Sequence, residues 1–242
     1  MSDGHLQDLI DIQNEVRQAF KWEYDDDLHS ADRMNLAFEG EAPFGVAYWN
    51  NRGRDKTLDD ICQILTSSKR VLIVGAAAQK EVLEKISLED ACIIAADGSV
   101  GALEDYQKLV CTVSDLDGGA HIDSAASKGQ RFIIHAHGDN HNRWENILAK
   151  WSDLPEPPEL VLSHQTNETF SGMKNFGGFT DGDRALCFAI WAGVKIQNIE
   201  LIGFSTDKIG EWSGVTNKQK KLKKLLWMEK IVSMLNLEHQ IN

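Results

Sequence analysis

The sequence has few basic residues, no long apolar run and no closely spaced cysteines. Its 25 lysines and arginines are outnumbered by 37 aspartates and glutamates, and the formal net charge is -12. Binding to nucleic-acid phosphates requires a broad basic surface, so this charge argues against a nucleic-acid partner. No apolar run approaches the roughly 20 residues that a membrane-spanning helix needs. We therefore expect neither a nucleic-acid partner nor a membrane anchor.

The cysteines form no ligand pattern. They are Cys62, Cys92, Cys111 and Cys187, and three of them lie within the apolar runs ACII, LVCTV and ALCFAIW. Without CxxC spacing the sequence predicts no cysteine-bound zinc, and buried reduced thiols are typical of a reducing compartment. The segment MSDGHLQDLIDIQ carries acidic residues where a secretion signal has basic ones. We expect a cytoplasmic protein.

Short apolar runs alternate with helical segments from Arg70 onward. The runs are RVLIV, ACIIA, LVCTV, RFIIHA, ELVLSH and IELIGF. Strands that alternate with helices at this spacing form βαβ units, which build a mainly parallel sheet with helices on both faces. The sequence therefore predicts a doubly wound α/β fold over residues 67–242, preceded by a small helical region with an entry loop over residues 1–66.

The N-terminal region has its own helical pattern. This polar region carries a stripe of residues at helical spacing, and we predict two or three helices that end near Gly40 and Pro43. The residues of the stripe are Leu6, Leu9, Ile10, Gln13, Val16 and Phe20. Thr57 with Asp60 resembles a capping box, which would open a helix there and leave WNNRGRD as a loop. Arg52 in that loop is a candidate phosphate ligand, because a guanidinium group suits bidentate phosphate recognition.

Aspartates follow three consecutive predicted strands: ADGS follows ACIIA, SDLDG follows LVCTV, and HGDN follows RFIIHA. The carboxyl ends of parallel strands share one edge of the sheet, where open α/β folds bind ligands. That edge would receive Asp97, Asp115, Asp117 and Asp139. Carboxylates in one cleft repel each other unless a cation neutralises them, and oxygen ligands suit Mg²⁺. We predict a metal site here; the alternative is that these aspartates only mark turns and helix N-termini.

Two further segments are candidates for binding phosphate. GGFTDGDR precedes the apolar helix ALCFAIWAG, and glycines with helix N-terminal amides favour an anion. Thr180 or Asp181 would also serve there as a simple N-cap. TNKQKKLKKLLWMEK concentrates lysines on a predicted helix. Lys220 and Lys223 are our candidate triphosphate contacts, and a solvated charged face is the alternative.

The stretch RFIIHAHGDNHN leaves a second kind of metal site open. His135, His137 and His141 could bind zinc, whose usual ligands include imidazole nitrogens. His135 belongs to the predicted strand, however, where a histidine often points into the core. A dinucleotide-binding fingerprint is not supported, because VLIVGAAAQKE carries only Gly75 at the first strand-to-helix turn.

The motifs ADGS, SDLDG, HAHGDN and GGFTDGDRA, with the lysine-rich final helix, resemble those of the archaeal 6-hydroxymethyl-7,8-dihydropterin pyrophosphokinases. That family looks related in its catalytic domain to the thiamine pyrophosphokinases, and the resemblance extends from about Trp49 to Leu235. It implies an enzyme that uses Mg²⁺ to transfer the terminal pyrophosphate of ATP to the hydroxymethyl group of a dihydropterin, with release of AMP. Such a reaction serves folate or tetrahydromethanopterin biosynthesis.

The resemblance also implies roles for individual residues. The acidic metal and phosphate site would consist of Asp97, Asp115, Asp117 and Asp139. His137 and Asn140 belong to the HAHGDN loop, while Gly178, Thr180 and Asp181 would lie near the nucleotide or pterin. Asp139 or His137 would accept the hydroxyl proton. The chain departs from the family where GAAAQK replaces a GxGPSL-type turn and GFST, residues 203–206, replaces GMDF.

Two other functions stay open at this point. A zinc hydrolase would use the HAHGDNH cluster, and a non-catalytic module would bind a nucleotide without consuming it. The partners we expect are small molecules, ATP and a dihydropterin alcohol, and related folds suggest a homodimer.

Overall fold

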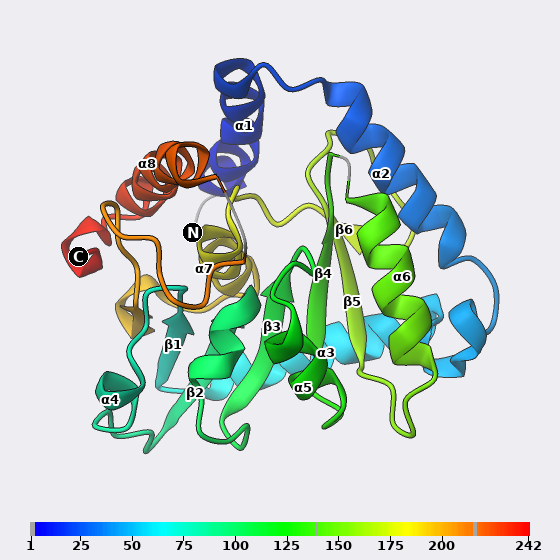
Figure 1. The fold of residues 1–242 in the computed structure, drawn as a ribbon, viewed down its shortest axis with the longest axis horizontal. Helices are drawn as coiled ribbons and strands as arrows, with labels where there is room; N and C mark the ends of the chain where they lie inside the picture. Colours follow the sequence, from blue (N-terminus) through cyan, green and yellow to red (C-terminus); the bar gives the residue numbers. More distant parts are fainter. Residues whose placement is uncertain (1–2, 139, 215–216) are drawn as a thin grey trace.

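A computed structural model describes residues 3–138, 140–214 and 217–242 (Figure 1). Its centre is a seven-stranded sheet with the order β6-β5-β4-β3-β2-β1-β7, in which all neighbouring strands run parallel. The strands are β1 (Arg70–Val74), β2 (Ala91–Ala96), β3 (Leu109–Ser114), β4 (Phe132–Ala136), β5 (Leu160–His164), β6 (Met173–Lys174) and β7 (Ile199–Ile202). The predicted α/β class with a parallel sheet is confirmed.

Every predicted apolar run forms a strand, and β6 is an addition. It has 2 residues, which is too short to produce a recognisable pattern. Strand order follows the chain from β1 to β6, after which the chain returns to place β7 beside β1. The strand order therefore reverses between β1 and β7, and such a reversal is where open α/β sheets form a crevice for ligands.

Helices cover both faces of the sheet (Figure 1). One face carries α1 (Asp3–Phe20), α3 (Asn51–Ser67), α7 (Asp181–Trp191) and α8 (Lys218–Met234). The other carries α2 (Tyr24–Ala37), α4 (Lys80–Leu83), α5 (Ala120–Ala126) and α6 (His141–Ser152). Short 3-10 helices are η1 (Pro43–Gly45), η2 (Ala47–Trp49), η3 (Asp97–Ala102), η4 (Ile196–Asn198) and η5 (Glu238–Gln240).

The strands supply side chains to two separate cores. Successive residues of a strand point to opposite faces of a sheet. Val71 and Ile73 of β1 pack with the first group of helices, and Leu72 and Val74 pack with the second. This explains why the runs read as continuously apolar, because both faces of the sheet are buried.

The prediction of a loop at WNNRGRD is wrong. Helix α3 begins at Asn51, and the side chain of its N-cap Asn50 accepts a hydrogen bond from Gly53 N at 2.9 Å. Thr57 lies inside the helix, where its hydroxyl donates to Gly53 O at 3.1 Å. A threonine that bonds to the carbonyl four residues earlier is a helix-interior arrangement, so Thr57 is no cap. No helix of the described ranges combines the length and apolarity that a membrane span requires.

Candidate functional site

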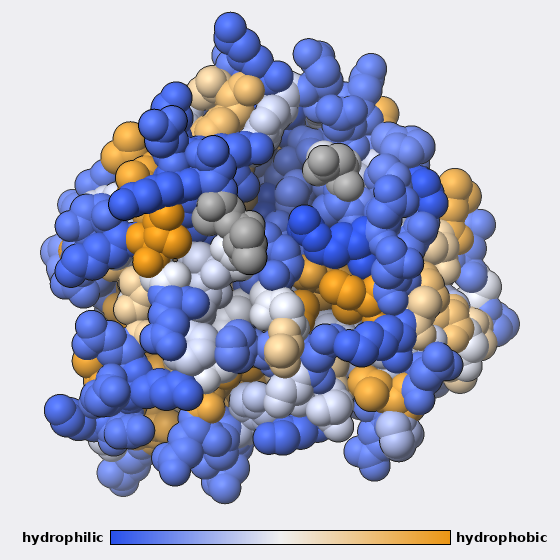
Figure 2. Space-filling model, in the orientation of Figure 1, coloured by the Kyte–Doolittle hydropathy of each residue, from blue (hydrophilic) through white to orange (hydrophobic). Residues whose placement is uncertain are grey.

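The carboxyl ends of the strands border an open cavity. The loop after β1 contacts the loop after β7 there. Gly75 permits this close approach, because a Cβ at that position would lie only 2.8 Å from Gly203 O. Helices α7 and α8 and the segment at Trp22 complete the wall. Figure 2 shows that the viewed face of the molecule is mostly hydrophilic, with apolar side chains exposed in smaller groups.

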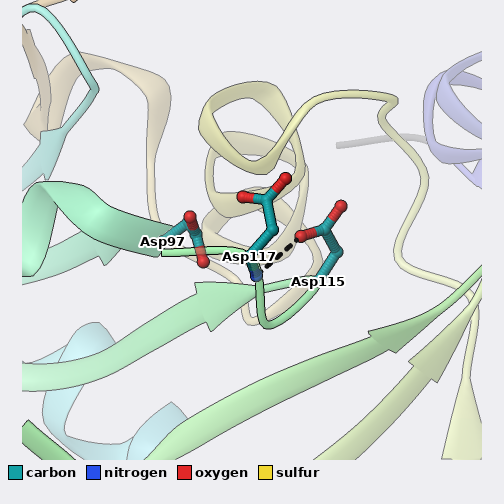
Figure 3. A group of neighbouring side chains, drawn as sticks. All are labelled: Asp97, Asp115 and Asp117. Atoms are coloured by element: carbon teal, nitrogen blue, oxygen red, sulfur yellow. Dashed lines mark hydrogen bonds between the residues drawn. The ribbon is translucent and has the colours of Figure 1, made fainter. Parts of the chain in front are cut away.

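Three aspartates from neighbouring strand ends meet in this cavity. One oxygen of each of Asp97, Asp115 and Asp117 lies within 4.8 Å of the others, and Figure 3 shows the three side chains side by side. Asp97 begins η3 and accepts hydrogen bonds from Ser114 Oγ at 2.5 Å and from Gly118 N at 3.1 Å. The adjacent strands β2 and β3 thus deliver a buried carboxylate and a pair of turn carboxylates to one point.

Burial and mutual repulsion dominate the electrostatics of the site. Burial, together with the charges of Asp181, Asp115 and Asp117, raises the pKa of Asp97 well above its usual value. Burial and the charges of Asp115 and Asp117 raise the pKa of Asp181 to about 7. Burial alone would also raise the pKa of Asp115, but the hydrogen bond with His137 and nearby arginines outweigh it and lower that pKa. The site therefore favours a cation.

His137 is joined to the acidic cluster. Its Nε2 lies 3.0 Å from Asp115 Oδ2, and Arg143 Nη1 lies 3.7 Å from Asp115 Oδ1. His137 follows β4 directly and lines the cavity. The strand end therefore places an imidazole next to the aspartates, in the position that the motif HAHGDN predicts.

At the start of α7, one aspartate caps the helix and another lines the cavity. Thr180 is the N-cap, and its Oγ1 donates to Asp183 Oδ2 at 2.6 Å while Thr180 N bonds to the same carboxylate. Asp183 is thus the acid that completes the cap. Within the described part of the chain, Asp181 Oδ1 is buried without a hydrogen-bond partner, and both Thr180 and Asp181 line the cavity. Asp181 is available to a ligand.

Basic residues line the same cavity as the aspartates. Its basic lining residues are Arg184, Lys208, Lys221 and Lys224. Lys224 Nζ lies 5.5 Å from the ring centre of Trp22 and 5.3 Å from that of Phe179, and burial lowers its pKa. A cavity lined by both carboxylates and ammonium groups suits a polyanion bound together with a metal ion.

Several predicted ligands lie elsewhere. Lys220 and Lys223 are exposed on α8, and Arg52 is exposed in the first turn of α3; these three do not line the cavity. Gly178 and Asn140 are buried and do not line the cavity either. Asp139 lies outside the described residues.

Helical periodicity is the sequence signal that groups the two lysines lining the cavity on one face of α8, although only packing decides which face meets the cavity. Lys221, Lys224, Leu225 and Met228 share one stripe at i, i+3, i+4 and i+7, and all four line the cavity.

The zinc alternative receives no geometric support. The ring nitrogens of His135 lie 3.0 Å from Ser163 Oγ and 3.3 Å from Gln165 Oε1, and burial lowers its pKa well below the usual value. His141 instead contacts the ring of His29 edge-on at 5.5 Å. Across the described ranges, the candidate metal-ligand group consists of the three aspartates and no histidine. An all-oxygen donor set fits a hard cation such as Mg²⁺ better than zinc.

The segments that depart from the resembling family also border the cavity. Gly75, Ala76 and Ala77 line it, as do Gly203, Phe204 and Ser205. Ser205 Oγ donates to Asp207 Oδ1 at 2.8 Å, so a carboxylate reaches this loop from two residues further along.

Comparison with known proteins identifies three archaeal relatives, each named 6-hydroxymethyl-7,8-dihydropterin pyrophosphokinase. The Pyrococcus furiosus protein is 37% identical over 148 residues, 60% of this chain and 60% of the relative. The Methanocaldococcus jannaschii protein is 30% identical over 184 residues, 72% of this chain and 69% of the relative. The Methanothermobacter thermautotrophicus protein is 36% identical over 107 residues, 43% of each chain. The match thus spans less than two thirds of two of these relatives. No protein-family model matches the chain.

We predict that Mg²⁺ raises the melting temperature and that Asp117→Asn removes most of this effect. A cation that binds only the folded state stabilises it by mass action, and replacing one carboxylate by an amide removes a charged ligand. In Asp117→Asn, the Mg²⁺ concentration that gives half of the rise in melting temperature should be at least ~10-fold higher than in the unaltered protein. Thermal denaturation at increasing Mg²⁺ measures this, with the exposed Asp32→Asn as control. An unchanged Mg²⁺ dependence in Asp117→Asn would exclude Asp117 from the site.

We also predict that Asp181→Asn stabilises the metal-free protein at pH 8. The folded-state pKa of Asp181 is about 7, whereas an aspartate in an unfolded chain titrates near ~3.9. Between these two pKa values, the folded state holds a proton on Asp181 that the unfolded state lacks. The free energy of unfolding therefore falls as the pH rises, and the full cost of ionising Asp181 in the folded state applies above pH ~7.

The asparagine avoids this penalty. It should therefore add on the order of 2 kcal/mol at pH 8 and almost nothing at pH ~4. Urea unfolding in a chelator at both pH values tests this, and a gain that is independent of pH would contradict it.

Proposed function

The chain belongs to the 6-hydroxymethyl-7,8-dihydropterin pyrophosphokinase family, and on that premise we propose that it transfers the pyrophosphoryl group of ATP to the hydroxymethyl group of 6-hydroxymethyl-7,8-dihydropterin. The observation that carries the proposal is the cavity in which three clustered aspartates face Arg184, Lys221 and Lys224. Phosphoryl-group transfer depends mainly on positioning and on neutralising the triphosphate, and this arrangement is suited to both tasks.

The aspartates would hold the metal ion. Asp97, Asp115 and Asp117 supply oxygen ligands, and the unpartnered carboxylate of Asp181 lies in the same cavity. Bound Mg²⁺ would neutralise part of the charge on the triphosphate.

The basic residues would bind the phosphate oxygens that remain. Lys221 and Lys224 extend from α8, and the Arg184 guanidinium extends from the buried first half of α7. Bidentate contacts of a guanidinium and point contacts of ammonium groups would align the triphosphate for attack at its β-phosphorus.

His137 is our candidate for accepting the hydroxyl proton. When His137 Nε2 donates to Asp115, 3.0 Å away, Nδ1 carries the lone pair and acts as the base. The acceptor oxygen forms a bond to the β-phosphorus, the bond from that phosphorus to the α-phosphate oxygen breaks, and AMP leaves. Asp139 remains the second candidate from the sequence.

Incubation with ATP, Mg²⁺ and 6-hydroxymethyl-7,8-dihydropterin should release AMP in an amount equal to the pyrophosphorylated product. Chromatographic separation of the nucleotides measures this, and a reaction without the pterin is the control. ADP as the only nucleotide product would contradict pyrophosphoryl transfer. ATP that binds but is never consumed would instead identify a non-catalytic nucleotide-binding module. A panel of other small alcohols would define the acceptor.

Lysine substitutions on α8 should separate the two sides of that helix. We expect Lys221→Met and Lys224→Met to lower kcat/KM for ATP by about 10- to 100-fold each, because each removes a charge-assisted contact to phosphate. Lys223→Met is the matched control on the exposed side of the same helix and should stay within about twofold. An equal loss in this control would mean that the effect comes from net charge and not from the cavity.

A further inference from the structure

We propose that helices α1 and α2 are part of the substrate-binding machinery, and that Asp27 is a positioning residue that holds the loops after β4 and β5 against the cavity. This inference rests on the function proposed above. It gives a role to the N-terminal helices, which the strand-end motifs leave without one.

Asp27 joins three separate parts of the chain. It lies in the first turn of α2 and is 4% exposed. Its Oδ1 accepts hydrogen bonds from Gly138 N at 2.7 Å and from Gln165 Nε2 at 2.7 Å. Its Oδ2 accepts from Arg17 Nη1 of α1 at 2.8 Å. One buried carboxylate thus connects both N-terminal helices to the ends of two strands.

The contact with Gln165 extends to the cavity. Because Gln165 Nε2 is directed at Asp27, its Oε1 faces the other way and accepts from Arg184 Nη2 at 2.5 Å. Arg17 Nη1 also donates to Gln165 O at 3.0 Å, which fixes the backbone of the same residue. Gln165 and Arg184 both line the cavity. Asp27 therefore determines where the guanidinium that faces the triphosphate is held.

The contact of Asp27 with Gly138 fixes the position of the loop that carries His137. Gly138 has a φ of 42°, a left-handed conformation that glycine adopts readily. On the far side of position 139, Ser30 Oγ of α2 donates to Asn140 Oδ1 at 2.9 Å, and the same oxygen accepts from His137 N at 3.1 Å. Helix α2 thus holds this loop at two points.

Helix α1 holds the segment before α7 in the same way. Gly178 N donates to Leu9 O at 3.1 Å, and Gln13 Nε2 donates to Gly178 O at 3.1 Å. Gln13 also exchanges hydrogen bonds with Asn175. Gly178 precedes the N-cap Thr180 by two positions, so α1 fixes the backbone that leads into Asp181 and Arg184.

The arrangement differs from a simple structural ion pair. A buried pair is weak support for stability, because the cost of desolvating two charges offsets their attraction. An ion pair with Arg17 needs only one oxygen of Asp27. The other oxygen is occupied by two donors from the cavity loops, so substitutions can remove the ion pair and the loop contacts separately.

The test is the affinity for α,β-methylene-ATP with Mg²⁺, measured by titration calorimetry. This analogue cannot be cleaved between the α- and β-phosphates, and a dissociation constant does not depend on the fraction of active enzyme. Asp27→Ala, which loses both kinds of contact, should bind at least ~10-fold more weakly. Asp27→Asn keeps an oxygen for Gly138 and Gln165 but loses the ion pair, so it should lower the melting temperature yet bind within ~3-fold of the unaltered protein.

The matched control is Arg33→Gln, which removes an ion pair between α2 and α6 without touching either loop. Its affinity should be unchanged. An Asp27→Ala protein that binds normally would overturn the positioning role. So would an Asp27→Asn protein that loses as much affinity as Asp27→Ala, because affinity would then follow stability. If the unaltered protein fails to bind the analogue, the proposed function falls, and the inference falls with it.

A second variant covers the case in which Asp27→Ala does not fold. Gln13→Leu removes the side-chain contacts of α1 with Gly178 and Asn175 and leaves the buried ion pair intact. We expect it to weaken binding of the analogue at least ~3-fold. Unchanged affinity in this variant would contradict the role of α1.

Discussion

Repulsion among carboxylates at one edge of the sheet is the constraint on which the rest of this structure depends. Asp97, Asp115 and Asp117 are brought within a few ångströms, and Asp181 faces them from α7. Such a group destabilises the folded chain unless a cation, a proton or a hydrogen-bond donor offsets its charge. The site offers a basis for each of the three. Asp115 has His137 and Arg143, Asp97 and Asp181 have raised pKa values, and the clustered oxygens suit a divalent cation.

A charged cavity of this kind must be held by the surrounding structure. The parallel strands fix Asp97, Asp115 and His137, because each follows its strand directly. The loops beyond them are less constrained by the sheet, and the hydrogen bonds of α1 and α2 supply the missing support. Hydrophobic contact of α1 and α2 with the two cores provides the anchor for those bonds. The N-terminal helices and the α/β region therefore pack as one unit around the cavity.

The sequence predicts the strand-end residues well and the helical residues poorly, for a physical reason. A strand followed by aspartate has one geometric consequence in a parallel sheet, so Asp97, Asp115 and Asp117 could be grouped in advance. A lysine-rich helix offers several faces, and which face meets the cavity depends on packing; Lys221 and Lys224 line it, while the predicted Lys220 and Lys223 do not. Thr57 shows the same limit, because its hydroxyl can cap a helix or bond within one.

The sequence by itself determined the α/β class, the six longer strands and the edge at which the acidic residues gather, since these follow from local periodicity and from the parallel direction of the strands. Only the tertiary structure decided that Asp181 lines the cavity together with the three clustered aspartates, and that Asp27 reaches Gly138 and Gln165 from more than a hundred residues away along the chain. Contacts between distant segments depend on how helices pack on the sheet. A single sequence carries no local pattern from which that packing can be read.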